Sequence, residues 1–305
     1  MDPGVESRFD ANQDAQAIHE AMGQLSLSKD RIIEMIAHIP LETRVKLPKY
    51  FERMGEDIIQ KLKSVFREDL ELAILWSFYD RAHLNAAALQ KAMNATETDN
   101  DLLIHVICTA DEYEIRPMKG AFQEITGKCL LKAIDKECRG DFKRVLVAII
   151  EGYRVKEYDE VQARIDAKEL FAASGDKLET TFIRILCGSS MKQTRLIDKY
   201  YQVLSGHDLI TVIEKALSGD VGKSLKLIVN FAKNRIATLS EMLYESLQGG
   251  VTRSASVIRI VLALAEGELG LIKVYFDLNF EQSLAETIGA QTSGDYKKFL
   301  LALFP

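Results

Sequence analysis

Proline is scarce in this chain: five prolines occur among 305 residues, and two of them, Pro3 and Pro305, lie at its ends. Because proline interrupts helices, this scarcity accommodates long helical segments. Strand signals are scarce as well, since alternating apolar and polar runs are rare and no Gly-x-Gly phosphate loop follows a strand-like segment. No apolar run approaches the roughly 18 residues of a membrane-spanning helix, so we expect none.

Cysteine and positive charge are also limited. None of the four cysteines has C-x-x-C spacing, so we expect reduced thiols rather than disulfides or a metal site. The net charge of −6 argues against a dedicated nucleic-acid binder. It also disfavours binding to an anionic membrane by charge alone, so such contact would need a bridging cation.

The N-terminal tail, residues 1–12, lacks the apolar core of a signal peptide. Asp2 occupies the position where myristoylation needs glycine, and no cysteine for prenylation closes the chain. We therefore expect a cytoplasmic protein. No nucleophile motif such as G-x-S-x-G occurs, so we do not expect an enzyme.

One short segment recurs four times, each time after an apolar run. We call its copies the first to fourth Gly-Asp segments: Arg67-Glu68-Asp69-Leu70, Arg139-Gly140-Asp141-Phe142, Ser218-Gly219-Asp220-Val221 and Ser293-Gly294-Asp295-Tyr296. Their aspartates are 72, 79 and 75 residues apart. A near-constant period along a whole chain indicates one folding unit copied four times.

The period predicts four repeats, at residues 13–80, 81–154, 155–232 and 233–305. Each repeat has five apolar segments with spacings of three and four, which place the side chains on one helical face. We therefore predict an all-α protein of four five-helix repeats that fold as one block. In the Gly-Asp segments, glycine would end one helix and aspartate would cap the next. Glu68 replaces the first glycine, so we expect a differently shaped turn there.

This pattern resembles the annexin superfamily over about residues 13–305. The short tail and the incomplete loop motifs look most like those of the alpha-giardins, which are divergent protist annexins. The resemblance implies a gently curved disc of four domains, with Ca2+ loops on its convex face that bridge backbone carbonyls to acidic phospholipid headgroups. Alpha-giardins are associated with the cytoskeleton and with membrane surfaces. The fourth repeat carries the likeness best, in Leu243-Tyr244-Glu245-Ser246-Leu247-Gln248-Gly249-Gly250, Val257-Ile258-Arg259 and Thr292-Ser293-Gly294-Asp295-Tyr296-Lys297-Lys298.

The family's main Ca2+ site joins three carbonyls of a loop after the first helix to one acidic side chain, three positions before the glycine of the Gly-Asp segment. Ca2+ is a hard ion that takes about six to eight oxygen ligands. The resemblance implies weak or lost sites in the first, third and fourth repeats, where the loops are 22–27, 173–177 and 248–252. The residues at the acidic position are Val65, Glu137, Ala216 and Gln291.

The second repeat is the exception, because Glu137 supplies the acid 42 residues after Ala95. In its loop, Met93 to Thr98, Ala95 and Glu97 replace both glycines, which alters the carbonyl geometry. The candidate Ca2+ ligands are thus Met93, Ala95, Glu97 and Glu137. The alternative is that Glu137 is a solvated charge at a helix end.

A second candidate site lies at the first Gly-Asp segment. Glu68, Asp69 and Glu71 place three carboxylates within four residues, near the carbonyls of Val65 and Phe66, and such a set can form a weak Ca2+ site. The alternative is that Asp69 caps the following helix while the acids stabilise its dipole.

Two functions are consistent with these patterns. The degraded loops favour a structural or scaffolding protein with cytoskeletal protein partners and weak Ca2+ binding at one or two sites at most. It would lie in the cytoplasm, at the cytoskeleton or at the inner membrane surface. The alternative is Ca2+-dependent peripheral binding to acidic phospholipid, which needs several good loops because single weak sites hold vesicles poorly.

Overall fold

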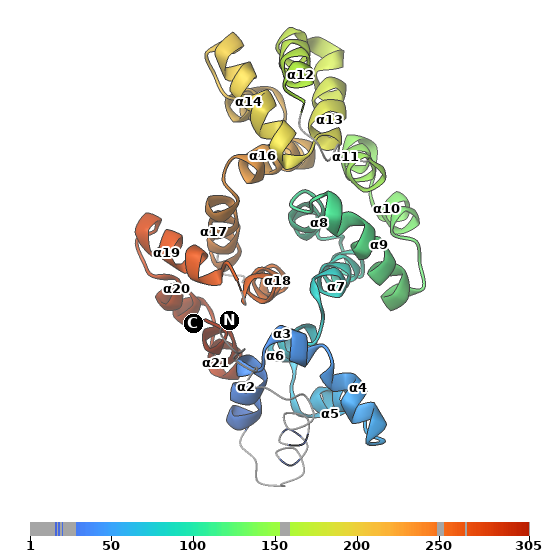
Figure 1. The fold of residues 1–305 in the computed structure, drawn as a ribbon, viewed down its shortest axis with the longest axis vertical. Coiled ribbons are helices and arrows are strands. Elements are labelled where there is room, and N and C mark those ends of the chain that lie inside the picture. The colour runs from blue at the N-terminus through green and yellow to red at the C-terminus, as the bar shows by residue number, and fades with distance from the viewer. Residues whose placement is uncertain are drawn as a thin grey trace, which may run out of the picture. The chain divides into compact units, whose positions relative to one another are not determined.

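The computed structural model describes residues 29–152, 159–248, 253–265 and 267–304, together with residues 16, 18 and 20. Within these ranges all regular structure is helical, which confirms the all-α prediction (Figure 1). The chain divides into two compact units, one made of residues 1–84 and 243–305 and the other of residues 85–242. Residues 1–12 and the loops 22–27 and 249–252 lie outside the described residues.

The first unit joins the two ends of the chain, and α21 lies beside α2 in Figure 1. In this unit α2 packs on α21 and α18 packs on α6. Its helices are α2 (Lys29–His38), α3 (Leu41–Arg44), α4 (Leu47–Arg53), α5 (Ile58–Val65), α6 (Glu68–Trp76), α18 (Ser254–Leu264), α19 (Leu269–Asn279), α20 (Leu284–Gln291) and α21 (Gly294–Ala302).

The second unit repeats this packing with helices from the middle of the chain. Here α11 packs on α13 and α8 packs on α16, so in both units the second helix of one predicted repeat meets the fifth helix of another. Its helices are α8 (Asn100–Ile107), α9 (Glu112–Thr126), α10 (Leu130–Glu137), α11 (Gly140–Glu151), α12 (Glu160–Ala172), η1 (Gly175–Lys177), α13 (Leu178–Gly188), α14 (Met191–Ser205), α15 (Leu209–Ala216) and α16 (Gly219–Lys233). Two further helices contain residues of both units, α7 (Arg81–Met93) and α17 (Arg235–Leu247).

The third helical segment of the first predicted repeat, which contains Val45 and Phe51, is divided into α3 and α4. Pro48 lies at the start of α4, where its missing N–H cannot bond the preceding turn, so the helix restarts there. The same residue type does not end α9, which continues through Pro117.

The apolar positions that predicted the helices form the core of each unit. Phe51 and Phe276 in the first unit, and Phe182 and Leu225 in the second, are all completely buried. Trp76 is 5% exposed, as expected of a core residue rather than a membrane anchor. All four cysteines have free thiols in the structure.

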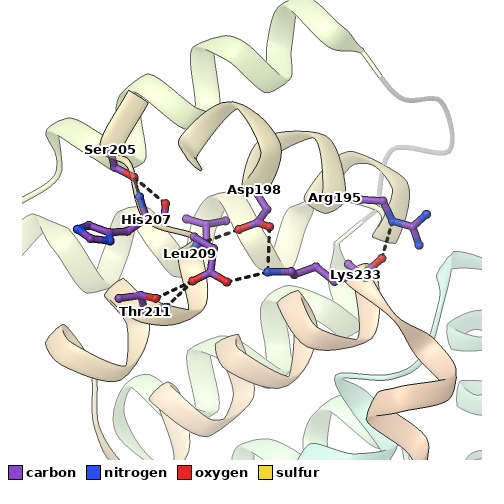
Figure 2. Close-up of polar contacts among 9 residues, drawn as sticks. Arg195, Asp198, Ser205, His207, Leu209, Thr211 and Lys233 are labelled. Atoms are coloured by element: carbon purple, nitrogen blue, oxygen red, sulfur yellow. Dashed lines mark hydrogen bonds and ion pairs between the residues drawn. The ribbon is translucent and has the colours of Figure 1, made fainter. Parts of the chain in front are cut away.

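Lys233 forms ion pairs with two aspartates, a cluster we call the lysine clamp, and so fastens the end of α16 to α14 and to the start of α15 (Figure 2). The Nζ atom of Lys233 lies 2.7 Å from Asp208 Oδ2 and 3.4 Å from Asp198 Oδ2. Asp208 also caps α15 by accepting a hydrogen bond from the Thr211 backbone amide. Burial alone would raise the pKa of Asp208, but the bonds from Lys233 and Thr211 lower it to about 2.

Candidate functional site

The four Gly-Asp segments share one backbone conformation. Gly140, Gly219 and Gly294 have φ angles of 58°, 61° and 57°, and Glu68 has a φ of 55°. The expectation that Glu68 gives the first turn a different shape is therefore wrong. Because a side chain is strained in this left-handed region, the first segment keeps the shared turn at an energetic cost.

The aspartates of these segments are not N-caps, contrary to prediction, because α6, α11, α16 and α21 each begin one residue earlier. Three of the aspartates instead reach the first turn of a helix in another predicted repeat of the same unit, and Asp295 is linked to another repeat only through Lys298. The pairs are Asp69 with Ser254 at 2.5 Å, Asp220 with Asn100 at 2.7 Å, Asp141 with Glu179, and Asp295 with Lys298 at 3.3 Å, which in turn bonds Asp30 at 2.6 Å.

The predicted Ca2+ site of the second repeat is only partly assembled. Met93, Asn94 and Glu137 line one cavity of about 200 Å3. Ala95 and Glu97 are exposed and lie outside that lining. The structure thus brings one predicted backbone ligand, from Met93, to the same cavity as the predicted carboxylate.

The loop after α7 has an ordinary backbone. Among the described residues, Glu68 alone has a positive φ without being glycine, so Ala95 and Glu97 do not adopt the left-handed conformation that a glycine allows. The loop closes through a 3.0 Å hydrogen bond from the Asp99 amide to the Ala92 carbonyl. The carboxylate of Asp99 then caps α8 through the Leu102 amide.

A lysine forms an ion pair with the carboxylate of this cavity. Glu137 has a side chain that is 27% exposed, and its Oε1 atom lies 2.9 Å from Lys136 Nζ. Lys136 and Lys128 both line the cavity. A carboxylate with nearby main-chain oxygens suits Ca2+, but the ion would have to compete with Lys136 for Glu137.

The candidate ligands of the first Gly-Asp segment bond to other groups and do not all line one cavity. Asp69 accepts a hydrogen bond from Ser254, and the Phe66 carbonyl accepts one of 2.7 Å from Arg67. Glu68 and Asp69 line a cavity of about 210 Å3 that does not include Glu71. Across the described ranges, no three His, Cys, Asp or Glu side chains are grouped so that they could hold a metal ion.

An acidic pair that the sequence did not reveal lies between the second and third predicted repeats. Asp141, Asp176 and Glu179 line a cavity of about 560 Å3, together with Arg144 and Ala216. Burial and the hydrogen bond to Asp141 raise the pKa of Glu179. Hydrogen bonds from Arg144 and Glu179 lower the pKa of Asp141. No sequence signal pairs these residues, because the contact depends on how two repeats pack.

No helix in the described parts of the chain is both long enough and apolar enough to cross a membrane. The model of the family described as Annexin matches residues 85–149, 165–228 and 239–303. Annexin A13 of Mus musculus is 32% identical over 302 residues, which is 97% of this chain and 95% of that protein. Annexin A7 of Homo sapiens is also 32% identical over 97% of this chain, which spans 62% of that relative.

The solved structures that this chain resembles include annexins as well. Annexin III matches with a TM-score of 0.91 and 28% identity over 97% of this chain and 94% of its own. Chicken annexin V in complex with Zn2+ matches with a TM-score of 0.85 and 28% identity, covering 97% and 96%. A calcium-bound alpha-14 giardin, at 20% identity and a TM-score of 0.80 over 97% of this chain and all of that one, shares the fold.

Proposed function

Because this chain belongs to the annexin family, we propose that it is an annexin-type structural or scaffolding protein with few and weak Ca2+ sites. In this proposal four repeats, at residues 13–80, 81–154, 155–232 and 233–305, present surfaces to cytoskeletal protein partners. The protein works in the cytoplasm, at the cytoskeleton or at the inner membrane surface. Catalysis has no part in it.

One contrast carries the proposal. The contacts that join the repeats are kept, since three Gly-Asp aspartates contact another predicted repeat directly and Asp295 is linked to one through Lys298. The ligands for Ca2+ are not kept, since one of the four acidic positions holds a carboxylate, that of Glu137. A framework that retains its internal contacts while its cation ligands are lost favours a scaffold over a Ca2+-driven membrane binder.

Ca2+ binding remains part of the proposal at the second repeat. Glu137 and the main-chain oxygens of Met93 and Asn94 are the groups that would hold the ion, since all three residues line one cavity. Ca2+ bound there would supply positive charge that can attract a phosphate oxygen. Glu97 and Ala95 would join only if the loop changed its conformation. The site at Glu68, Asp69 and Glu71 stays a weaker candidate.

The second candidate function is Ca2+-dependent binding to acidic phospholipid. Annexin relatives with full-length similarity favour it, and the cavity at Glu137 offers one place where Ca2+ could bridge to a headgroup. One weak site binds vesicles poorly because avidity requires several simultaneous contacts. The scaffold therefore remains our first proposal.

Vesicle co-sedimentation separates the two functions. The full chain is mixed with phosphatidylserine vesicles at millimolar Ca2+ or with excess EDTA, and Glu137→Gln serves as the matched variant. A scaffold predicts little Ca2+-dependent pelleting for either protein. Strong pelleting of the wild type that Glu137→Gln reduces would overturn the scaffold proposal. Co-pelleting with polymerised actin and with microtubules, each without vesicles, tests the cytoskeletal partner directly.

A further inference from the structure

An arginine side chain donates hydrogen bonds to the free carbonyl oxygens at the second Gly-Asp segment. The Nη1 atom of Arg139 donates hydrogen bonds to the carbonyls of Asp135, Lys136 and Cys138, at 2.9, 2.7 and 2.9 Å. These carbonyls belong to the end of α10, where the helix leaves its last acceptors without partners of its own. One charged nitrogen thus gathers three main-chain oxygens.

The first Gly-Asp segment has a similar arrangement with two carbonyls in place of three. The Nη1 atom of Arg67 donates to the Phe66 carbonyl at 2.7 Å and also to the Lys63 carbonyl at the end of α5. Arg67 and Arg139 hold the same position, one residue before the left-handed residue of the turn. The two arginines lie in different units, so the arrangement occurs in each of them.

The third and fourth Gly-Asp segments carry serine at that position. Ser218 and Ser293 make no side-chain capping bond. Each of these segments adjoins an open cavity that an arginine-bearing segment lines as well, the second segment through Asp141 and the first through Glu68 and Asp69. Leu217 lies on the cavity of about 560 Å3 with Asp141 and Glu179, and Ser293 lies on the cavity of about 210 Å3 with Glu68 and Asp69.

Several carbonyl oxygens directed at one point are ligands that a hard cation such as Ca2+ prefers. A guanidinium group is also a cation, and it stays charged at every physiological pH. We propose that Arg67 and Arg139 act as built-in cations at the first and second Gly-Asp segments. Each guanidinium group bonds the carbonyl oxygens there and so prevents Ca2+ from binding to them. At the fourth segment, which carries serine here, the corresponding Gly289 carbonyl accepts a 3.0 Å hydrogen bond from the Nζ atom of Lys297, another cationic side chain. The proposal concerns Ca2+ alone and does not depend on a lipid or protein partner.

The plainer alternative is that each arginine only caps a helix, because a basic side chain at a helix C-terminus satisfies carbonyls and the dipole. The two interpretations predict different effects of removing the arginine. If the arginine is only a cap, its removal leaves a less stable helix end whose stability Ca2+ does not restore. If it is a built-in cation, its removal leaves oxygen ligands beside carboxylates, and Ca2+ can then bind to them.

The test is Arg139→Ser in the full chain, with Arg144→Ser as the matched control. Arg144 lies on the same stretch of α11 and pairs with Asp141, but its guanidinium makes no bond to the end of α10. Ca2+ binding is measured by isothermal titration calorimetry, and Tm is measured in EDTA and in millimolar Ca2+. We expect Arg139→Ser to have a lower Tm in EDTA and to gain one Ca2+-binding event. Its Tm should rise by about 2–4 °C more with Ca2+ than that of the wild type or of Arg144→Ser.

Arg67→Ser repeats the test in the other unit. A gain of Ca2+ response in either arginine variant, absent from Arg144→Ser, supports the proposal. If a variant does not fold in EDTA, folding that Ca2+ restores supports it as well. Two variants that respond to Ca2+ as the wild type does, or whose folding Ca2+ does not restore, would leave only the helix cap.

Discussion

The carboxylate of Asp220 accepts a 2.7 Å hydrogen bond from the side-chain amide of Asn100, which lies 120 residues earlier in the chain. This contact joins the Gly-Asp segment of the third predicted repeat to the first turn of α8 in the second. The aspartate therefore has two effects: its negative charge interacts favourably with the positive N-terminal end of α16, and its hydrogen bond links two repeats. The recurrence of this aspartate reflects packing between repeats as well as the turn itself.

Replacing this aspartate should weaken the second unit. We expect Asp220→Ala to lower the free energy of unfolding by about 1–2 kcal/mol, because it leaves Asn100 without its charged acceptor and removes an acid from a helix N-terminus. Urea unfolding followed by circular dichroism measures the change. Glu214→Ala is the control, since the exposed Glu214–Lys226 ion pair should contribute at most a few tenths of a kcal/mol. Equal losses in the two variants would contradict a role for the contact between repeats.

Glycine at position 68 should stabilise the protein. Glu68 has a φ of 55°, where a side chain is strained by about 1 kcal/mol relative to glycine. We therefore expect Glu68→Gly to raise the free energy of unfolding by up to about 1 kcal/mol. The same change at Glu71, inside α6, should lower it by a similar amount, because glycine is a poor helix former. Thermal unfolding that places the two variants on the same side of the wild type would refute this account.

The helices could be predicted from the sequence because apolar spacing records which face of a helix is buried, as at Ile33 and Phe182. The division of α3 from α4 was missed because one proline breaks a helix at Pro48 but is accommodated at Pro117. The shape of the first Gly-Asp turn could not be predicted from residue type, because glutamate rarely adopts the left-handed conformation that its position in the repeat requires. The surrounding helices impose the turn, and Glu68 follows it.

The candidate site was predictable only in part. The resemblance to annexins paired Glu137 with the loop after α7, and in the structure Glu137 lines one cavity with Met93 but not with Ala95 or Glu97. The ion pair between Glu137 and Lys136 could not be predicted, since adjacent residues on a helix normally point apart. The contacts of Arg139 were missed for a related reason. Which carbonyls an arginine reaches depends on how the chain turns after the helix.

The acidic pair between α11 and α13 should make stability depend on pH. The pKa of Glu179 is raised in the folded protein, so its ionised form is disfavoured there. The resulting penalty is absent below the unfolded pKa of about 4.5 and grows as pH rises from there through the folded value. Glu179→Gln removes the penalty, so it should be more stable than the wild type near pH 7, by up to about 1 kcal/mol for so exposed a pair. Near pH 4 the two proteins should be equally stable. Urea unfolding at both pH values measures this, and a constant difference between them would exclude the pair as its cause.

The clamp at Lys233 predicts the opposite pH dependence. The pKa of Asp208 is lowered to about 2 in the folded protein, so its ionised form adds stability above the unfolded value of about 4. That contribution is lost as pH falls from about 4 to about 2. Asp208→Asn keeps the helix cap of α15 but removes the charge, so it should be about 1 kcal/mol less stable near pH 6, discounted for the partial exposure of the pair. The deficit should shrink toward pH 2 in guanidinium unfolding. A deficit that persists there would point to the cap instead of the charge.

Lys136 should weaken Ca2+ binding at Glu137. The ammonium group lies 2.9 Å from the carboxylate and must move away before Ca2+ can take the same oxygen. The lysine side chain is 82% exposed, so this ion pair should contribute at most a few tenths of a kcal/mol, and Lys136→Gln should raise the Ca2+ affinity of the site by up to about twofold. Lys132→Gln changes the same charge on the same helix without touching the cavity, and Glu137→Gln removes the ligand itself. Calorimetric titration with Ca2+ should therefore give a tighter site for Lys136→Gln, little change for Lys132→Gln and a lost site for Glu137→Gln. If both lysine variants bind Ca2+ equally tightly, overall charge and not the ion pair sets the affinity, and if Glu137→Gln binds as the wild type does, the site lies elsewhere.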